Sequence, residues 1–127
     1  MVKVALVVVS HSVKLAEGVV ELAAQMAREV TFRAAGGTED GEIGTSFDKV
    51  FAAVEELLEA GHDVAILTDL GSATMTVEAV LEMVDATRVR FADGPLVEGA
   101  VSAAVTAQVG GDLAAVCEAA QAKELFA

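Results

Sequence analysis

The chain has 127 residues, of which 54% are hydrophobic and only 4% aromatic, and this predicts one domain (residues 1–127) with an aliphatic core. Twenty acidic against eight basic residues give a net charge of −12, which argues against nucleic-acid binding and favours encounter with a basic protein partner. The longest apolar run, Val4 to Val9, is much shorter than the roughly 20 residues of a membrane span, and it lacks a signal-peptide cleavage site. We therefore expect a cytoplasmic protein.

The amino-terminal third of the chain predicts a strand, a helix and a second strand. The β-branched run Val2–Val9 indicates the first strand, and Val30–Ala34 indicates the second. Between them, Lys14–Arg28 has helical periodicity. Its large apolar residues fall on one predicted core-facing stripe: Leu15, Val19, Leu22 and Met26.

The helix predicted for Phe47–Ala60 follows a glycine-rich loop, residues 36–46. Ser46 is a suitable N-cap for this helix, and Asp48 suits its first turn because a carboxylate interacts favourably with the helix dipole there. Gly61 is expected to end the helix.

The second half of the chain continues the alternation. We expect a buried strand at Val64–Thr68, a turn at 69–72 followed by a helix to about Val84, and a fourth strand at Val89–Ala92. Pro95 is expected at the first position of another helix.

The last predicted helix, Asp112–Leu125, follows the pair Gly110-Gly111. It carries the single cysteine, Cys117, on the same face as Leu113 and Val116, so we expect a buried structural thiol. One cysteine excludes an internal disulfide and is typical of a reducing compartment.

This alternation of strands and helices predicts an α/β fold, a three-layer sandwich with a four-stranded parallel sheet. The strand order 2-1-3-4 is a common solution for such a chain. In that order the carboxyl ends of strands 1 and 3 border the crevice in which ligands bind.

Polar residues that follow strands 1 and 3 form the candidate site. His11 follows strand 1 between Ser10 and Ser12, and Asp69 follows strand 3. The next residues, Gly71-Ser72, open a helix whose unpaired N–H groups would favour an anion. The second histidine, His62, precedes strand 3 at the opposite edge of the sheet, where we expect it in solvent and without a function.

Several chemistries fit these residues poorly. A Ser-His-Asp hydrolase lacks a GxSxG motif, and a P-loop would need Lys-Ser/Thr where the chain has Glu42-Ile43. A response-regulator receiver would need an acidic cluster at the end of strand 1, and His11 with Asp69 supplies too few ligands for a metal. The remaining hypothesis is a nucleophilic His11 whose tautomer is fixed by Asp69, acting in phosphoryl transfer.

The chain also resembles a known family, the phosphocarrier subunits of phosphoenolpyruvate-dependent dihydroxyacetone kinases, which carry a mannose-type EIIA domain of the phosphotransferase system. The similarity runs from about Val2 to Gly110. The motifs that carry it are Val9-Ser10-His11-Ser12, Leu15-Ala16-Glu17-Gly18, Ala35-Gly36-Gly37, Ile43-Gly44-Thr45, Thr68-Asp69-Leu70-Gly71-Ser72-Ala73 and Pro95-Leu96-Val97-Glu98-Gly99.

This resemblance implies that His11 becomes phosphorylated by phospho-HPr and passes the phosphoryl group to ADP on the nucleotide-binding subunit of the kinase. A dihydroxyacetone-binding subunit would complete that enzyme. Asp69 would orient His11, and the phosphoryl group would lie near Ser10, Ser12, Gly71 and Ser72. The phosphohistidine is covalent, so the chain would need no cofactor of its own. The family fold has a four-stranded parallel sheet and is usually a homodimer.

Two other functions stay open at this point. The chain could serve as the EIIA component of a mannose-type sugar permease, which alone would bring it to a membrane, or as a non-enzymatic anion-binding regulatory module. Some family members continue into HPr-like and enzyme I-like domains, and because this chain ends at Ala127 we expect a separate HPr. The acidic stretch Glu39–Glu42 receives no role.

Overall fold

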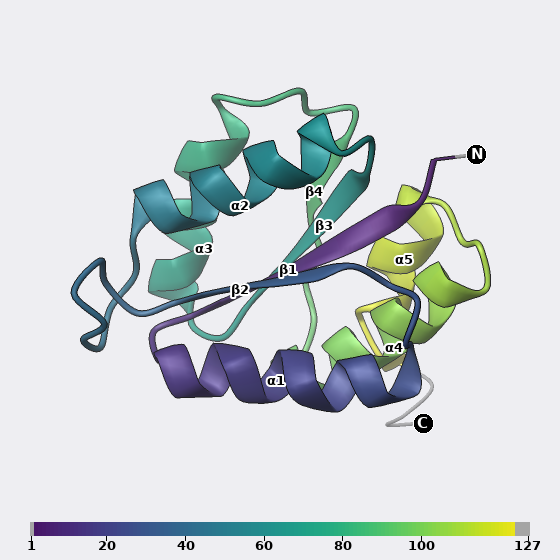
Figure 1. Cartoon of the computed structure of the whole chain (residues 1–127), viewed down its shortest axis with the longest axis horizontal. Coiled ribbons are helices and arrows are strands. Elements are labelled where there is room, and N and C mark those ends of the chain that lie inside the picture. Colours follow the sequence, from purple (N-terminus) through teal and green to yellow (C-terminus); the bar gives the residue numbers. More distant parts are fainter. Residues whose placement is uncertain (1, 124–127) are drawn as a thin grey trace.

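Four parallel strands form a sheet in the order β2-β1-β3-β4 in the computed structural model, which describes residues 2–123 (Figure 1). The strands are β1 (Val4–Ser10), β2 (Phe32–Gly36), β3 (Asp63–Thr68) and β4 (Val89–Phe91). The predicted fold class and strand order are confirmed. β1 is buried along its whole length and β3 nearly so, as befits strands that pack against helices on both faces.

Five helices cover the two faces of the sheet: α1 (Val13–Met26), α2 (Phe47–Glu59), α3 (Gly71–Leu81), α4 (Leu96–Gln108) and α5 (Leu113–Ala119). α1, α4 and α5 lie on one face, and α2 and α3 on the other (Figure 1). Alternate residues of β1 supply the two cores, with Leu6 and Val8 facing the first layer and Val7 and Val9 the second. Within residues 2–123 no helix is long and apolar enough to cross a membrane.

The stripe predicted for α1 is wrong in part. The residues that α1 buries are Ala16, Val19 and Ala23, whereas Leu15, Leu22 and Met26 are exposed. Small alanine side chains let the helix axis lie close to the sheet, and this turns the long side chains away from it. The buried face of α1 is therefore made by small residues and not by its largest apolar side chains.

Helix ends follow the sequence signals closely. The Ser12 and Ser46 hydroxyls accept hydrogen bonds from the N–H groups three residues later and so cap α1 and α2. Gly61 has φ +91° just after α2, in the left-handed region that favours glycine, so its predicted role as a helix stop is confirmed. Pro95 precedes α4 with an extended ψ of 130° and is its N-cap, not its first helical residue.

Other predicted boundaries differ from the structure as well. β1 begins at Val4 rather than Val2, and α1 ends at Met26 rather than Arg28. β2 begins at Phe32 rather than Val30, because the pairing with β1 begins between Phe32 and Leu6. α3 ends at Leu81 rather than near Val84. The last helix ends at Ala119, and Ala122 has a positive φ of 55°. The predicted end at Leu125 lies outside the described residues.

Cys117 lies on α5 and packs partly against the core beneath α1, α4 and α5. The prediction was a buried thiol, whereas Cys117 is half-buried in the structure. Burial raises the pKa of its thiol above the ordinary value of 9.0, and the nearby Arg90 guanidinium opposes that shift only in part. A raised pKa keeps the thiol protonated at neutral pH, which fits a structural residue.

Candidate active site

The carboxyl ends of β1 and β3 bring His11 and Asp69 together. Val9 pairs with Thr68 in the sheet, so the residues that follow the two strands leave it side by side. The His11 Nδ1 atom lies 2.9 Å from Asp69 Oδ1. Their side chains are 18% and 12% exposed, so the pair is largely but not completely removed from water. The structure thus brings together two residues that the sequence separates by 58 positions.

The Asp69 carboxylate accepts four hydrogen bonds. Oδ2 accepts from the Ser10 hydroxyl at 2.8 Å and from the His11 backbone N–H at 3.0 Å. Oδ1 accepts from the His11 ring and from the Leu70 backbone N–H, the latter at 2.7 Å. Burial acts to raise the pKa of Asp69, but the hydrogen bonds from His11, Ser10 and Leu70 together lower it below the ordinary 3.8. Asp69 is therefore ionised at neutral pH.

An ionised carboxylate can only accept hydrogen bonds, so Nδ1 of His11 carries a proton in this contact. In the neutral ring the other nitrogen, Nε2, then holds a lone pair. The Ser72 Oγ atom lies 2.6 Å from Nε2 and donates its proton to that lone pair. Asp69 thereby fixes which nitrogen is nucleophilic, and that nitrogen points at the start of α3.

The amino terminus of α3 is an open anion site beside Nε2. Its N-cap, Leu70, offers no side-chain hydrogen bond. The first N–H groups bonded along this helix are those of Ala73 and Thr74, both to the Leu70 carbonyl. The N–H groups of Gly71 and Ser72 precede those bonds, both residues are exposed, and the helix dipole favours negative charge at this end.

Ser10 and Ser12 use their hydroxyls within the protein. The Ser10 side chain is fully buried, donates to Asp69 and accepts the Ser12 backbone N–H at 3.0 Å. The Ser12 hydroxyl caps α1 by accepting the Leu15 N–H at 3.2 Å. These contacts make Ser10 a support for Asp69 and Ser12 a support for α1. Phosphoryl binding by either hydroxyl stays a prediction, and the open donors are at Gly71 and Ser72.

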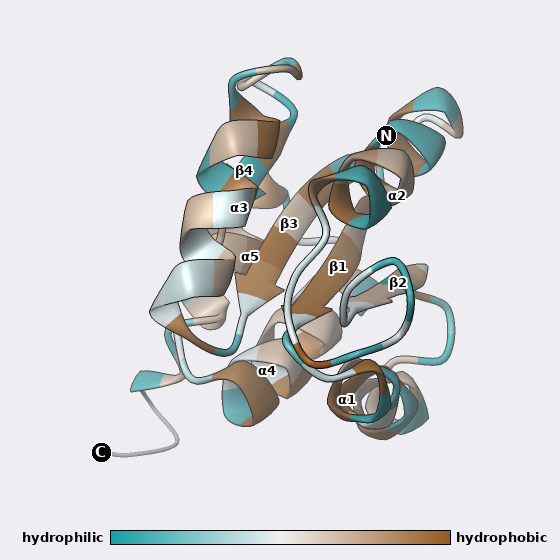
Figure 2. Cartoon of the chain, turned by 90° about the vertical axis from the view of Figure 1, so that its left-hand side faces the viewer, coloured by the Kyte–Doolittle hydropathy of each residue, from teal (hydrophilic) through white to brown (hydrophobic). Residues whose placement is uncertain are grey.

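Backbone contacts from the β2–α2 loop (residues 37–45) also reach the site, and sequence reasoning missed them. The Gly37 N–H donates to the Ser10 carbonyl at 3.0 Å, and the Gly44 N–H donates to the His11 carbonyl at 2.9 Å. Figure 2 shows this loop arching across the carboxyl ends of the strands. The glycines of the loop were visible in the sequence, but nothing in their spacing indicated which carbonyls they would meet.

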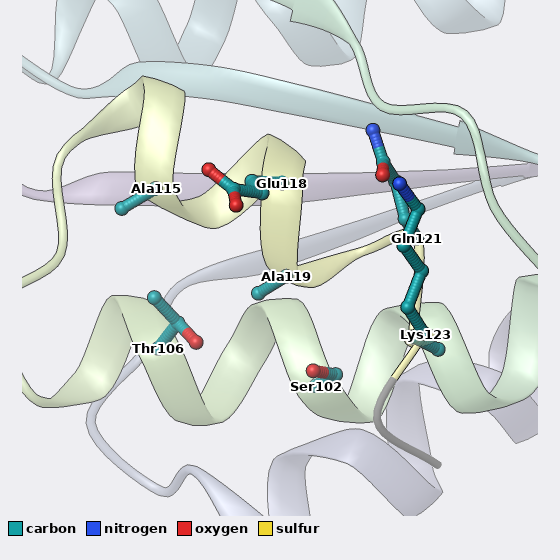
Figure 3. Close-up of a pocket in the computed structure, with 8 residues that line it drawn as sticks. Ser102, Thr106, Ala115, Glu118, Ala119, Gln121 and Lys123 are labelled. Carbon is teal, nitrogen blue, oxygen red and sulfur yellow. The ribbon is translucent and has the colours of Figure 1, made fainter. Parts of the chain in front are cut away.

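Two segments that reach the site also carry exposed apolar side chains. Ile43 of the β2–α2 loop is 77% exposed, and Leu70 and Met75 at the start of α3 are 60% and 71% exposed. A cavity of about 480 Å³ lies elsewhere, between α4 and α5, and is lined by none of the predicted site residues (Figure 3). The site residues thus lie next to segments that expose apolar side chains, an arrangement that favours a protein partner over an enclosed small molecule.

His62 lies at the opposite edge of the sheet, as predicted, but it is half-buried rather than in solvent. Its Nδ1 atom is 3.2 Å from the Lys3 carbonyl oxygen. It borders a cavity of about 270 Å³ beside residues 29–31 and 107–111. No carboxylate contact to this ring occurs within residues 2–123.

Comparison with known proteins points to one family. Residues 5–117 match the EIIA-man family, described as the PTS system fructose IIA component. The PTS-dependent dihydroxyacetone kinase phosphotransferase subunit DhaM of Lactococcus lactis is 40% identical over 113 residues, or 89% of each chain. A phosphoryl donor subunit DhaM of PEP-dependent dihydroxyacetone kinase 1 from Listeria innocua is 41% identical over 103 residues, or 81% of each chain.

Other relatives are longer. The phosphoryl donor subunit DhaM of Escherichia coli is 42% identical over 115 residues, which are 85% of this chain but 24% of the relative. The chain thus spans about a quarter of that protein.

Solved structures share the fold. A crystal structure of a protein of unknown function has a TM-score of 0.86 at 33% identity, with 94% of both chains covered. The mannose/sorbose-specific IIA subunit of the phosphotransferase system from Enterococcus faecalis has a TM-score of 0.63 and covers 98% of this chain and 92% of its own. At 19% identity, that second likeness concerns the fold alone.

Proposed function

Because the chain belongs to the EIIA-man family of phosphotransferase-system proteins, we propose that it is a histidine phosphocarrier. His11 accepts a phosphoryl group from phospho-HPr and passes it to ADP held on the nucleotide-binding subunit of a dihydroxyacetone kinase. The observation that carries this proposal is the pairing of His11 Nδ1 with Asp69 at 2.9 Å, which directs Nε2 towards the start of α3. That arrangement presents a neutral nucleophilic nitrogen beside an anion site.

In the first step, the Nε2 lone pair attacks the phosphorus of phospho-HPr. The new Nε2–P bond forms as the P–N bond to the donor histidine breaks, and the electron pair of that bond returns to the donor ring. The Ser72 hydroxyl turns from Nε2 to a phosphoryl oxygen, joined by the N–H groups of Gly71 and Ser72. The phosphorylated ring keeps its Nδ1 proton and becomes positively charged, and the Asp69 carboxylate stabilises that charge.

In the second step, a β-phosphate oxygen of ADP attacks the phosphorus and the Nε2–P bond breaks. The bonding pair returns to Nε2, so His11 is again neutral and ATP has formed on the kinase subunit. The dihydroxyacetone-binding subunit then supplies the final acceptor. Both steps need only positioning and charge stabilisation, which fixed N–H donors and a carboxylate can supply.

The relatives favour this acceptor over a sugar permease, because the DhaM proteins named above act with dihydroxyacetone kinases. The exposed apolar side chains of Ile43, Leu70 and Met75 support exchange with protein partners. Because HPr is its proposed donor, we expect phosphoryl transfer to take place in the cytoplasm. Covalent transfer rather than simple anion binding is supported by Asp69, because a site that only held an anion would gain nothing from a carboxylate beside it.

Incubation with phosphoenolpyruvate, enzyme I and HPr tests the proposal. Wild-type protein should acquire one acid-labile phosphate, and His11→Ala should acquire none. Addition of the ADP-loaded nucleotide-binding subunit should then discharge the phosphate and form ATP. Absence of label on the wild type, or an equal label on His11→Ala, would refute the histidine assignment. His62→Ala is the matched control, and it should be labelled like the wild type.

We also propose a homodimer, as the family resemblance implies. Apolar side chains are exposed along the outer surfaces of the neighbouring helices α1 and α4. They are Leu15, Leu22 and Met26 on α1 and Val97 and Val105 on α4. Light scattering should give twice the chain mass for the wild type and for Ala52→Glu on α2. Leu22→Glu should give a monomer, and a monomeric wild type would contradict this proposal.

A further inference from the structure

The β2–α2 loop (residues 37–45) is held in one conformation by contacts within itself. The Thr38 N–H donates to the Glu42 carbonyl at 2.9 Å, and the Thr38 hydroxyl accepts the Glu42 N–H at 3.2 Å. Gly44 has φ +145°, and a Cβ atom there would lie 2.8 Å from the Thr38 side chain. Because a larger residue at Gly44 would clash with Thr38, the loop can fold this tightly only with glycine at that position.

The same loop connects the His11 backbone to helix α3. On one side, the Gly44 N–H donates to the His11 carbonyl at 2.9 Å. On the other side, the next residue, Thr45, forms a hydrogen bond between its hydroxyl and that of Thr76, with the two oxygens 2.8 Å apart. This second contact is partly buried, so water competes for it less than at the surface.

Thr76 lies one helical turn after Ser72, and its hydroxyl is 3.5 Å from the Ser72 carbonyl oxygen. Ser72 in turn donates to Nε2 of His11. The contacts therefore form a ring that leaves His11 at its carbonyl group and returns to the same residue at its imidazole. No side chain caps the amino terminus of α3. The loop stabilises the first turns of this helix instead, through the Thr45–Thr76 hydrogen bond.

We infer that Thr45 and Thr76 are positioning residues: their hydrogen bond holds the start of α3 so that Ser72 and the Gly71 and Ser72 N–H groups face Nε2 of His11. The inference rests on the proposed phosphocarrier function, since it assigns these residues to the positioning of that site. Neither hydroxyl touches the ring or the transferred group. The covalent steps are unchanged, and the loop acts only on where the donors lie.

Position matters here because the donors act over hydrogen-bond distances. A shift of about 1 Å between a donor and a reacting group can lower a rate up to about 100-fold. Without the Thr45–Thr76 pair, the hydroxyls of Thr68 and Thr74, 3.0 Å apart, still join β3 to α3. We therefore expect a smaller shift and a decrease of about tenfold in the rate of transfer. Docking of the partner should change little, because its apolar contacts at Ile43, Leu70 and Met75 remain.

The first test uses unphosphorylated protein and needs no donor. In ¹⁵N spectra of the His11 ring, Nε2 of the wild type should show an accepted hydrogen bond, and Ser72→Ala gives the reference signal without that bond. Thr45→Val, which keeps the shape of the side chain but removes its hydroxyl, should move the Nε2 signal towards that reference. Thr45→Ser should restore the wild-type signal. Thr106→Val on α4 is the matched control, and it should give the wild-type Nε2 signal.

The second test measures transfer from phospho-HPr. Thr45→Val and Thr76→Val should each lower kcat about tenfold, with KM for HPr within about twofold of the wild type and thermal unfolding little changed. Because the two hydroxyls act as one pair, the double variant should be no slower than either single variant. Independent effects that multiply in the double variant would overturn the inference.

An Nε2 signal in Thr45→Val equal to that of the wild type would also overturn it, whatever the kinetics show. This outcome is distinct from failure of the proposed function. If His11 of the wild type accepts no phosphate from HPr, the phosphocarrier proposal fails. The ¹⁵N comparison still decides whether the loop positions Ser72 against the ring.

Discussion

The two histidines of this chain occupy opposite edges of the same sheet and share two features. Each ring is partly buried, and each uses Nδ1 to contact an oxygen atom, at 2.9 Å for His11 and 3.2 Å for His62. For His11 the oxygen belongs to the carboxylate of Asp69, whereas for His62 it belongs to the backbone carbonyl of Lys3. Burial and an Nδ1 contact therefore do not distinguish the two histidines.

The difference lies in charge and in helix direction. In a parallel sheet with connecting helices, every helix begins near the carboxyl edge, so His11 faces the positive end of α3. His62 follows the carboxyl end of α2, where the dipole disfavours a phosphoryl group. A full negative charge behind the ring and a positive helix end in front of it distinguish His11, the proposed phosphate acceptor, from His62.

The largest expected effect on this contrast comes from Asp69→Asn, which makes the oxygen behind His11 uncharged, like the one behind His62. Both Asp69 oxygens accept a backbone N–H, from His11 and from Leu70, so either orientation of the amide opposes an N–H group. We expect phosphoryl transfer to fall about 10- to 100-fold. The free energy of unfolding should fall by about 1–3 kcal/mol. Rapid-quench transfer assays and urea unfolding measure both effects, and an unchanged rate would contradict the role of Asp69.

A smaller effect is expected for Ser10→Ala. This variant keeps His11 and Asp69 but removes the hydroxyl that donates a hydrogen bond to Asp69. Ser10 is fully buried, and the variant leaves the Ser12 N–H and one carboxylate oxygen each short of a hydrogen bond. We expect a loss of about 1–3 kcal/mol in the free energy of unfolding. Transfer should slow less than in Asp69→Asn, because the charge remains. Greater slowing in Ser10→Ala would show that the hydroxyl, not the charge, dominates.

Low pH should remove the difference in charge between the His11 edge and the His62 edge of the sheet, because it protonates Asp69. The pKa of Asp69 is lowered from 3.8 in the folded protein, so its hydrogen bonds stabilise the fold fully above about pH 5. That contribution is lost as the pH falls below 3.8 through the lowered folded-state value. Urea unfolding from about pH 5 downwards should therefore show a steeper loss of stability in wild type than in Asp69→Asn. His62→Gln should keep the wild-type slope, and parallel curves for wild type and Asp69→Asn would contradict this account.

The smallest effect is expected for His62→Gln. The glutamine amide can still donate a hydrogen bond to the Lys3 carbonyl, so the free energy of unfolding should fall by no more than about 1 kcal/mol. Phosphoryl transfer should be unchanged, because nothing at this edge contacts the site. Thermal unfolding and the transfer assay check both statements. A transfer rate that fell as far as in Asp69→Asn would break the comparison between the two edges.

Much of the fold could be predicted because its signals are local. The apolar runs of β1 and β3, the N-cap serines Ser12 and Ser46, and the stop at Gly61 each depend on a few neighbouring residues. The α1 stripe was predicted wrongly, because periodicity identifies an apolar side of the helix but not which part of it packs closest to the sheet. The positive φ of Ala122, which follows α5, has no local signal in the sequence.

The sequence by itself determined the strand-ending positions of His11 and Asp69, the fold class and the choice of His11 as the proposed nucleophile. Only the tertiary structure decided that Asp69 contacts Nδ1 and leaves Nε2 facing the start of α3, that Ser10 supports Asp69, and that the β2–α2 loop reaches α3. Those contacts join residues between 31 and 61 positions apart in the chain. Local patterns of hydrophobicity carry no information about such distances, because side-chain direction is set only when the sheet and both helix layers pack together.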